Sequence, residues 1–357
     1  MYRRVPVGAV IATALLVLAA CSSTTTGPNS STAPQSSTPG ATASASDAPD
    51  PAVLAAVKGK TVVLINGDNA DAFFLSIWAG AKAEAEKYQL KFSEQAPNTY
   101  DYTLQAPLLV DAIAQKPDGI ILSPDSHTAF AANLQTAADM GIPIVGVNTS
   151  QTSENDNPNY LSFHGSDSIL LGQMAAEAML PMVDAKAKLT VINSVPGNVG
   201  TMKREKGFTD TIAAKAPGIT FLPTVFDNND VAQANSMTRD QLIANPDLAG
   251  IYAVDAFTGQ GVGNAVKGLN LQGKVKVVAI DALPSEIQLM KDGIIQALIA
   301  QQPYQMGVHA VDNLVKYWTG KKDQIVRSDI LPPIIVTPAN MNDPDIMNKV
   351  IYAANKP

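Results

Sequence analysis

The stretch TVVLINGDNADAFF, residues 61–74, decides the fold. It opens with the predicted strand Thr61–Asn66, whose interior Val-Val-Leu-Ile is an uninterrupted apolar run typical of a parallel strand covered on both faces. Polar residues follow at once. The next segment, Phe74–Tyr88, places apolar residues at three- and four-residue spacing, which predicts a helix. Strand, polar turn and helix together make one βα unit.

This βα unit recurs along the chain. Apolar runs predict further strands at Gly119–Ser123, Pro143–Asn148, Leu189–Ser194, Gly250–Val254 and Lys276–Ile280. Helical patterns lie between them, at Thr128–Met140, Ile169–Met182, Lys203–Ala214 and Val231–Ile243. Such repetition predicts an α/β fold of doubly wound parallel sheets. About 280 residues suit two sheets of this kind better than one.

The N-terminal region predicts export. Arg3 and Arg4 precede the apolar run Val7–Leu18, which closes on Leu-Ala-Ala-Cys with the cysteine at Cys21. Basic residues, an apolar core and small residues predict a signal peptide at residues 1–20. The core is shorter than the roughly 20 residues that a membrane span needs.

The residues around the predicted cleavage site resemble the lipobox of bacterial lipoproteins. That resemblance implies that Cys21 carries a diacylglycerol and becomes the first mature residue, which would anchor the protein to the outer face of the cell membrane. An ordinary signal peptide with a chance cysteine is the alternative. We expect residues 21–58 to hold the lipidated cysteine and a disordered linker of Ser, Thr, Pro and Ala.

Composition excludes several classes of protein. Cys21 is the only cysteine, so neither an internal disulfide nor a cysteine nucleophile in the folded body is available. The formal net charge of −7 argues against nucleic acid, or an anionic membrane surface, as the partner. Apart from the lipid anchor, we therefore expect no membrane contact.

Polar residues stand where the predicted strands end. Asn66 follows the first strand, Asn148 closes the third, Asp255 follows the fifth and Asp281 follows the sixth. Ligands of open α/β sheets bind beyond the carboxyl ends of the strands, so these side chains should face a common crevice. For any single residue, helix capping or turn formation remains an equal alternative.

Over Lys60–Thr337 the chain resembles the type I periplasmic binding proteins, especially the branch similar to ribose-binding protein. The pieces that carry the resemblance are Phe73-Phe74, Gly141-Ile142-Pro143, the run Arg204–Phe208 and the run Ile299–Gly307. Their order and spacing fit that family together, although no single piece would suffice.

The resemblance implies two Rossmann-like lobes with a ligand between them, joined by a three-segment hinge. The three crossovers are expected near Gly165–Asp167, Gln301–Pro303 and Asp329–Leu331. The N-terminal lobe would then comprise residues 59–165 plus 302–329, and the C-terminal lobe residues 166–301 plus 330–357.

Carried onto this chain, the resemblance implies ten ligand-binding residues that suit a polyhydroxyl ligand. Ionised carboxylates accept hydrogen bonds from hydroxyls, the arginine and amides donate them, and phenylalanine rings stack on C–H faces. The residues are Asn66, Asp71, Phe73, Phe74, Asn148, Arg204, Phe226, Asp255, Asp281 and Gln301. Core packing is the alternative for one of the two adjacent phenylalanines, and a surface position is the alternative for the arginine.

Two positions depart from the family. Ribose-binding relatives have an Asp-Arg pair where this chain has Asn148-Thr149, and an aromatic residue where it has Ile280. Losing a donor and a stacking ring predicts a different sugar, or an open-chain sugar alcohol. A deoxysugar or an autoinducer-like furanose is a weaker alternative.

The resulting expectation is a monomeric receptor that passes a small sugar or sugar alcohol to the permease of an ABC transporter. A receptor feeding a sensory or chemotaxis partner is the alternative. We expect neither an enzyme nor a cofactor, because no nucleophile elbow or dinucleotide loop is present. We also expect no metal site, because His127, His164 and His309 are far apart in the sequence.

Overall fold

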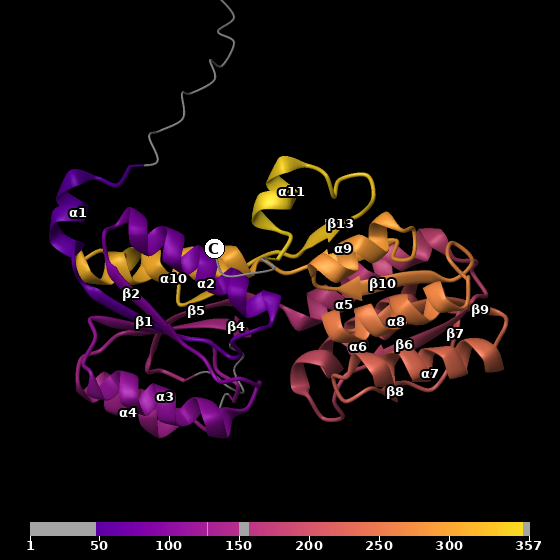
Figure 1. The fold of residues 1–357 in the computed structure, drawn as a ribbon, viewed down its shortest axis with the longest axis horizontal. Coiled ribbons are helices and arrows are strands. Elements are labelled where there is room, and N and C mark those ends of the chain that lie inside the picture. Colours follow the sequence, from indigo (N-terminus) through magenta and orange to yellow (C-terminus); the bar gives the residue numbers. More distant parts are fainter. Residues whose placement is uncertain (1–47, 127, 150–156, 353–357) are drawn as a thin grey trace, which may run out of the picture. The chain divides into compact units, whose positions relative to one another are not determined.

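The computed structural model describes residues 48–126, 128–149 and 157–352 (Figure 1). The predicted signal peptide, Cys21 and His127 lie outside these residues. Among the described helices, none has the length and apolar character that crossing a membrane requires.

The first sheet is entirely parallel, in the order β12-β5-β4-β3-β1-β2. Its strands are β1 Thr61–Ile65, β2 Lys91–Gln95, β3 Gly119–Leu122, β4 Ile144–Thr149, β5 Tyr160–Ser166 and β12 Ser328–Ile330. One face is covered by α2 (Ala72–Lys87) and α10 (Pro303–Trp318), and the other by α3 (Tyr102–Ala114) and α4 (Ala131–Asp139) (Figure 1).

The second sheet follows the order β13-β11-β10-β9-β6-β7, and β8 also pairs with β6. Its strands are β6 Lys188–Asn193, β7 Thr220–Phe221, β8 Val225–Phe226, β9 Leu248–Ala253, β10 Lys276–Ile280, β11 Ala297–Ala300 and β13 Ile334–Val336. Only β13 runs antiparallel among the described pairings of this sheet.

Helices also cover both faces of the second sheet. On one side α5 (Ser168–Met179) packs against α6 (Val199–Lys215), and on the other α7 (Val231–Ala244) and α9 (Pro284–Lys291) pack against α8 (Ala256–Gly268). The remaining short helices are α1 Pro51–Val57, η1 Leu180–Met182, η2 Lys322–Gln324 and α11 Pro344–Lys349.

The chain passes between the two sheets three times. The first passage joins β5 to α5, the second joins β11 to α10, and the third joins β12 to β13. Ile330, the last residue of β12, pairs with Gly165 in the first sheet. The predicted class, two α/β lobes joined by a three-segment hinge, is confirmed.

All six predicted strands are confirmed within two residues at either end, and Lys276–Ile280 is β10 itself. These strands were recognisable because their side chains are buried on both faces. By contrast, β2 is an edge strand with exposed or half-buried side chains and gave no such apolar run.

One expectation about the linker is wrong, because Pro51–Val57 forms α1 instead of a disordered segment. Asp50 caps the helix by accepting a hydrogen bond from the Ala52 N–H at 2.8 Å, and Pro51 occupies its first turn. Val57 is fully buried, which fixes the helix to the body near α10. The folded body therefore includes this helix.

The same helix crossing occurs once in each lobe. A Cβ on Gly80 of α2 would lie 1.9 Å from the Tyr304 carbonyl oxygen of α10, and one on Gly172 of α5 would lie 1.9 Å from the Arg204 carbonyl oxygen of α6. Only glycine permits backbones to approach this closely. The second crossing places Arg204, a predicted site residue, against α5.

Candidate functional site

The helix α2 begins directly beyond β1 and carries three of the predicted site residues. Asp71 is its N-cap, and the carboxylate accepts a hydrogen bond from the Phe73 N–H at 2.9 Å. Phe73 and Phe74 are 7% and 5% exposed and meet edge to face with ring centroids 5.4 Å apart. The second ring also stacks on Tyr100. Helix capping and ring packing thus set all three side chains.

Asn66 directly follows β1, and Asn148 is the last residue but one of β4. The Asn66 side-chain nitrogen donates to the Phe74 carbonyl oxygen at 2.7 Å, and its Oδ1 is buried without a hydrogen-bond partner. Asn148 has a φ of 89°, which strains a residue other than glycine and turns the chain at the end of β4. The described partners of Asn66 lie within its own lobe.

Asp281 is the most heavily engaged residue of the second lobe. It follows β10, is 6% exposed and has a φ of 84°. Its Oδ1 accepts two hydrogen bonds, from Gln301 Nε2 at 2.7 Å and from the Tyr352 hydroxyl at 2.8 Å. Burial raises the pKa of this carboxyl, while the nearby Arg204 guanidinium opposes the rise.

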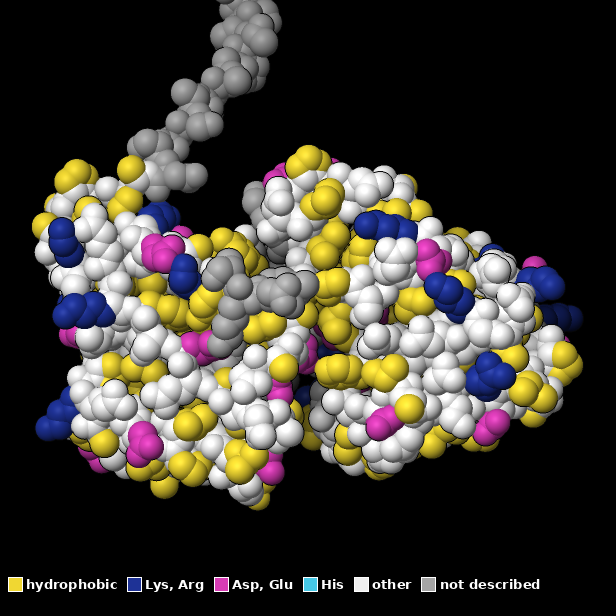
Figure 2. All heavy atoms as spheres, viewed as in Figure 1, with side chains coloured by type: hydrophobic (Ala, Val, Ile, Leu, Met, Phe, Trp, Pro, Cys, Tyr) yellow, Lys and Arg dark blue, Asp and Glu magenta, His cyan; other side chains and the backbone are white. Residues whose placement is uncertain are grey.

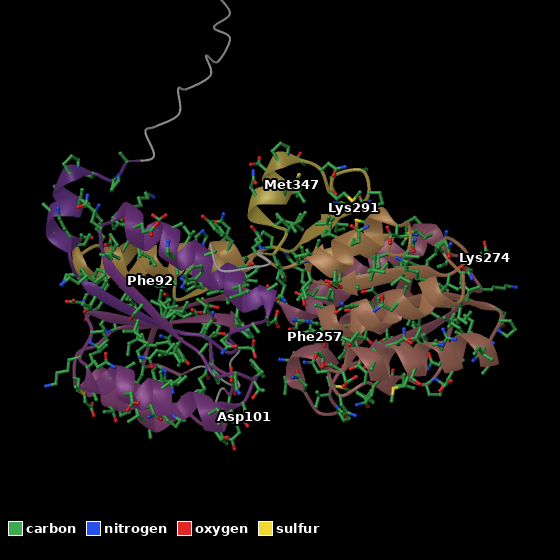
Figure 3. All side chains as sticks on the ribbon, viewed as in Figure 1. Phe92, Asp101, Phe257, Lys274, Lys291 and Met347 are labelled. Carbon is green, nitrogen blue, oxygen red and sulfur yellow. The ribbon has the colours of Figure 1, made fainter. Side chains whose placement is uncertain are left out.

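The other second-lobe residues lie at the start of α8, within α6 and on the short strand β8. Asp255 is the N-cap of α8 and accepts a hydrogen bond from the Thr258 N–H at 3.0 Å. Phe257, in the first turn of this helix, is labelled in Figure 3. Arg204 Nη1 donates to the Val254 carbonyl oxygen at 2.9 Å, and its Nε is buried without a partner. Phe226 lies on β8 and is half-buried.

Carboxylates from both lobes act on one another. Burial raises the pKa of Asp71 to about 7, and the negative charges of Asp281, Asp68 and Asp255 add to the rise. Three predicted carboxylates, Asp71, Asp255 and Asp281, thus lie close enough for their charges to repel, and the charge of Arg204 offsets part of this repulsion at Asp281. Among the described residues, no hydrogen bond or ring contact ties Phe226 or Asn148 to this cluster.

Two residues that the sequence reasoning missed adjoin the cluster. Glu286 is fully buried, and its Oε2 accepts a hydrogen bond from the Leu283 N–H at 3.0 Å, while its Oε1 has no partner. Burial keeps its pKa well above the ordinary value. The glutamate stands three residues after Leu283, the helix N-cap, and so supplies only the glutamate half of a capping box, which left little signal in the sequence. Tyr352, by contrast, had no signal in the sequence.

Two of the histidines, His164 and His309, are far apart in the sequence but lie side by side in the structure, with ring centroids 5.6 Å apart. Asp329 Oδ2 accepts from His164 Nδ1 at 3.0 Å and lies 2.9 Å from His309 Nδ1. Asn313 Nδ2 lies 3.1 Å from His164 Nε2 and donates to it, so this imidazole carries its proton on Nδ1. One ring nitrogen each of His164 and His309 and one carboxylate oxygen of Asp329 lie within 4.8 Å of one another. We interpret them as a hydrogen-bond network that joins β5, α10 and β12.

Comparison with known proteins places this chain in a family. The family described as periplasmic binding protein domain matches residues 62–322, so the chain belongs to it. Membership indicates an exported, extracytoplasmic protein. The predicted resemblance to type I periplasmic binding proteins is thereby confirmed.

Individual relatives within this family share only about a quarter of their residues with this chain over the matched region. The xylose/arabinose-binding protein XylF of Sulfolobus acidocaldarius is 27% identical over 69% of this chain, and the match spans 63% of that protein's own length. The ribose import binding protein of Bacillus subtilis is 26% identical over 71% of this chain and 79% of its own.

Solved structures agree on the architecture. An ABC transporter solute-binding protein from Agrobacterium vitis, bound with α-D-tagatopyranose, is 34% identical with a TM-score of 0.74, over 82% of this chain and 99% of its own. A carbohydrate transporter solute-binding protein from Agrobacterium radiobacter, in complex with D-arabinose, is 26% identical with a TM-score of 0.73, over the same shares.

Proposed function

We propose that this protein captures a small carbohydrate or sugar alcohol between its two lobes and delivers it to the permease of an ABC transporter. The single observation that carries the proposal is the carboxylate cluster of Asp71, Asp255 and Asp281, which adjoins the buried rings of Phe73 and Phe74. Carboxylate oxygens shielded from water need hydrogen-bond donors, and neighbouring ligand hydroxyls supply several at once. The rings exclude water and pack on C–H faces.

Binding would proceed by hinge closure through the three passages between the sheets. The ligand reaches one lobe first, and the contacts from Arg204, Asp255 and Asp281 form when the second lobe closes. Ligand therefore stabilises the closed form only by the free energy of these added contacts. The permease would recognise the closed arrangement of the two lobes.

Relatives that bind pentoses and hexoses support the ligand class. The four relatives named above bind ribose, xylose or arabinose, D-arabinose and α-D-tagatopyranose. We infer that Thr149 and Ile280, which depart from the ribose-binding pattern, shift the preference to another sugar or to an open-chain sugar alcohol. Ribose binding with a Kd below about 1 μM would contradict that shift.

The lipid anchor at Cys21 is part of the proposal and rests on the Leu-Ala-Ala-Cys motif. It would hold the body at the outer face of the membrane, within reach of the permease.

Figure 2 shows acidic and basic side chains scattered singly over the visible face, with no broad basic area that would suit nucleic acid.

A thermal-shift screen tests the ligand class. The chain from Ala48 onward holds every described helix and strand, and it is mixed with pentoses, hexoses and C4–C6 sugar alcohols. A ligand at one hundred times its Kd adds about 2.7 kcal/mol to the free energy of unfolding. We expect one stereospecific shift. A uniform lack of shifts across the panel would contradict a carbohydrate ligand.

A further inference from the structure

The C-terminal segment brings an aromatic residue into the candidate site. After β13 the chain forms α11, where Met347 is labelled in Figure 3, and then returns toward the second sheet. The Tyr352 N–H donates to the Ala282 carbonyl oxygen at 3.1 Å, next to Asp281. Tyr352 is 3% exposed, although it is the last residue that the structure describes. A residue so near the terminus is buried only when specific contacts hold it.

Its hydroxyl is bound to two groups at the carboxyl ends of the sheet. It donates to Asp281 Oδ1 at 2.8 Å and accepts from the Gln301 backbone N–H at 3.2 Å. Burial and the Asp281 charge hold the pKa of Tyr352 well above its ordinary value, so the hydroxyl remains a donor. Among the described residues, hydrogen bonds to Asp281 reach only Oδ1. The second carboxylate oxygen is left to accept from a ligand.

Its ring meets a site residue of the other lobe. Tyr352 and Phe73 are in edge-to-face contact, with centroids 5.6 Å apart. Ile280, where the ribose-binding relatives have an aromatic residue, is instead buried in the core of the second lobe. The Phe73 and Tyr352 rings thus form one aromatic surface that reaches Asp281, and half of it comes from the C-terminal segment.

We propose that Tyr352 is a ligand-binding and specificity-determining residue of this site, which rests on the proposed function. Its ring supplies the apolar wall on the second lobe that Ile280 does not provide. Its hydroxyl holds Asp281 in the orientation that presents Oδ2 to a ligand hydroxyl. Because the ring occupies space beside the carboxylate, it also limits the length of the ligand.

The test measures Kd by calorimetry for wild type, Tyr352→Phe, Tyr352→Ala and the control Tyr160→Phe. Tyr160 is equally buried but begins β5, at the opposite end of the strand from the site. Each protein is titrated with the sugar or sugar alcohol that shifts wild type most and with its homologue one carbon longer. We expect Tyr352→Phe to weaken the preferred ligand about tenfold, as loss of one positioning hydrogen bond implies.

We expect Tyr352→Ala to change the ratio of the two Kd values about tenfold toward the longer ligand, and Tyr160→Phe to leave both values unchanged. A merely structural role would lower the melting temperature of ligand-free protein without changing that ratio. If Tyr352→Ala does not fold, Tyr352→Phe alone decides. If both Tyr352 variants bind with the wild-type Kd values and keep the wild-type ratio, the inference about Tyr352 is overturned while the proposed function stands. A wild type that binds nothing in the panel would overturn the proposed function and this inference with it.

Discussion

The Gln301 side-chain amide donates to Asp281 Oδ1 at 2.7 Å, joining the ends of the neighbouring strands β11 and β10. The backbone of Asp281 has a φ of 84°, a conformation that asparagine tolerates better than alanine does. Asparagine at this position keeps an oxygen for Gln301 and for Tyr352 but replaces the second oxygen with a donor. The substitution Asp281→Asn therefore removes the charge of Asp281 and keeps its hydrogen bonds with Gln301 and Tyr352.

We expect Asp281→Asn to fold and to weaken ligand binding by about 1–3 kcal/mol, because a ligand hydroxyl loses its acceptor. Calorimetric titration measures the loss. Asp230→Asn is the control, since Asp230 is an exposed helix cap in the same lobe, on α7. An Asp281→Asn protein with wild-type affinity would show that the carboxylate does not contact the ligand.

The raised pKa of Asp71 predicts how stability depends on pH. In the folded chain this pKa is about 7 instead of the ordinary 3.8, so the folded state holds the proton more tightly than the unfolded state does. The stabilisation that comes from this tighter proton binding is complete below 3.8, the pKa of Asp71 in the unfolded chain, and is lost as the pH rises through about 7. At pH 8, ligand-free Asp71→Asn should exceed wild type by about 1 kcal/mol or more in free energy of unfolding.

Asp101→Asn is the matched control for this effect. Asp101 caps α3 as Asp71 caps α2, through a hydrogen bond from the N–H two residues on (Figure 3 labels Asp101). Its pKa is lowered by the Thr103 hydrogen bonds, so its replacement should not stabilise the protein at pH 8. Urea unfolding at pH 5 and pH 8 gives both comparisons. Equal gains for Asp71→Asn at the two pH values would contradict the assignment.

The close crossing of α2 and α10 predicts a non-additive pair. A Cβ on Gly80 would lie 1.9 Å from the Tyr304 carbonyl oxygen, and one on Gly307 would lie 2.2 Å from that of Ile77. Each alanine should lower the free energy of unfolding by about 1–3 kcal/mol. This is a net value, because alanine favours the helix more than glycine does and so offsets part of the cost of the clash. The double variant should cost less than the sum, because the first alanine has already separated the helices.

Urea unfolding of the two single variants and the double variant measures this coupling. Exposed Ala83→Ser on α2 is the control and should stay within about 0.5 kcal/mol of wild type. Strict additivity would mean that the two glycines do not share one crossing.

For the network around Asp329 we expect the opposite pH dependence from that of Asp71, with stability lost as the solution becomes acidic. The hydrogen bonds with His164 and His309 hold the pKa of Asp329 well below its ordinary value. This stabilisation is therefore present above the unfolded pKa and is lost as the pH falls. Asp329→Asn should lose about 1–3 kcal/mol at pH 7, and the difference should shrink toward pH 3.

Chemical unfolding across this pH range measures the difference, with the exposed Asp323→Asn as control. A pH-independent difference between Asp329→Asn and wild type would contradict a charged Asp329 in the network.

The sequence predicted best what depends on local pattern. Strands covered on both faces, such as β1 and β10, are continuous apolar runs, and helix caps such as Asp71 and Asp255 follow them directly. Contacts between distant segments left no such trace. Tyr352 meets Asp281 across 71 residues, and His164 meets Asp329 across 165, because the chain passes between the sheets three times.

The most direct test of the account is a calorimetric titration of the wild-type chain from Ala48 onward with the sugar or sugar alcohol selected by the thermal screen, alongside one epimer. We predict one ligand bound per chain with a Kd below about 10 μM, and binding of the epimer at least tenfold weaker. Equal affinities for the two stereoisomers, or no heat of binding from any sugar or sugar alcohol, would contradict a carbohydrate receptor.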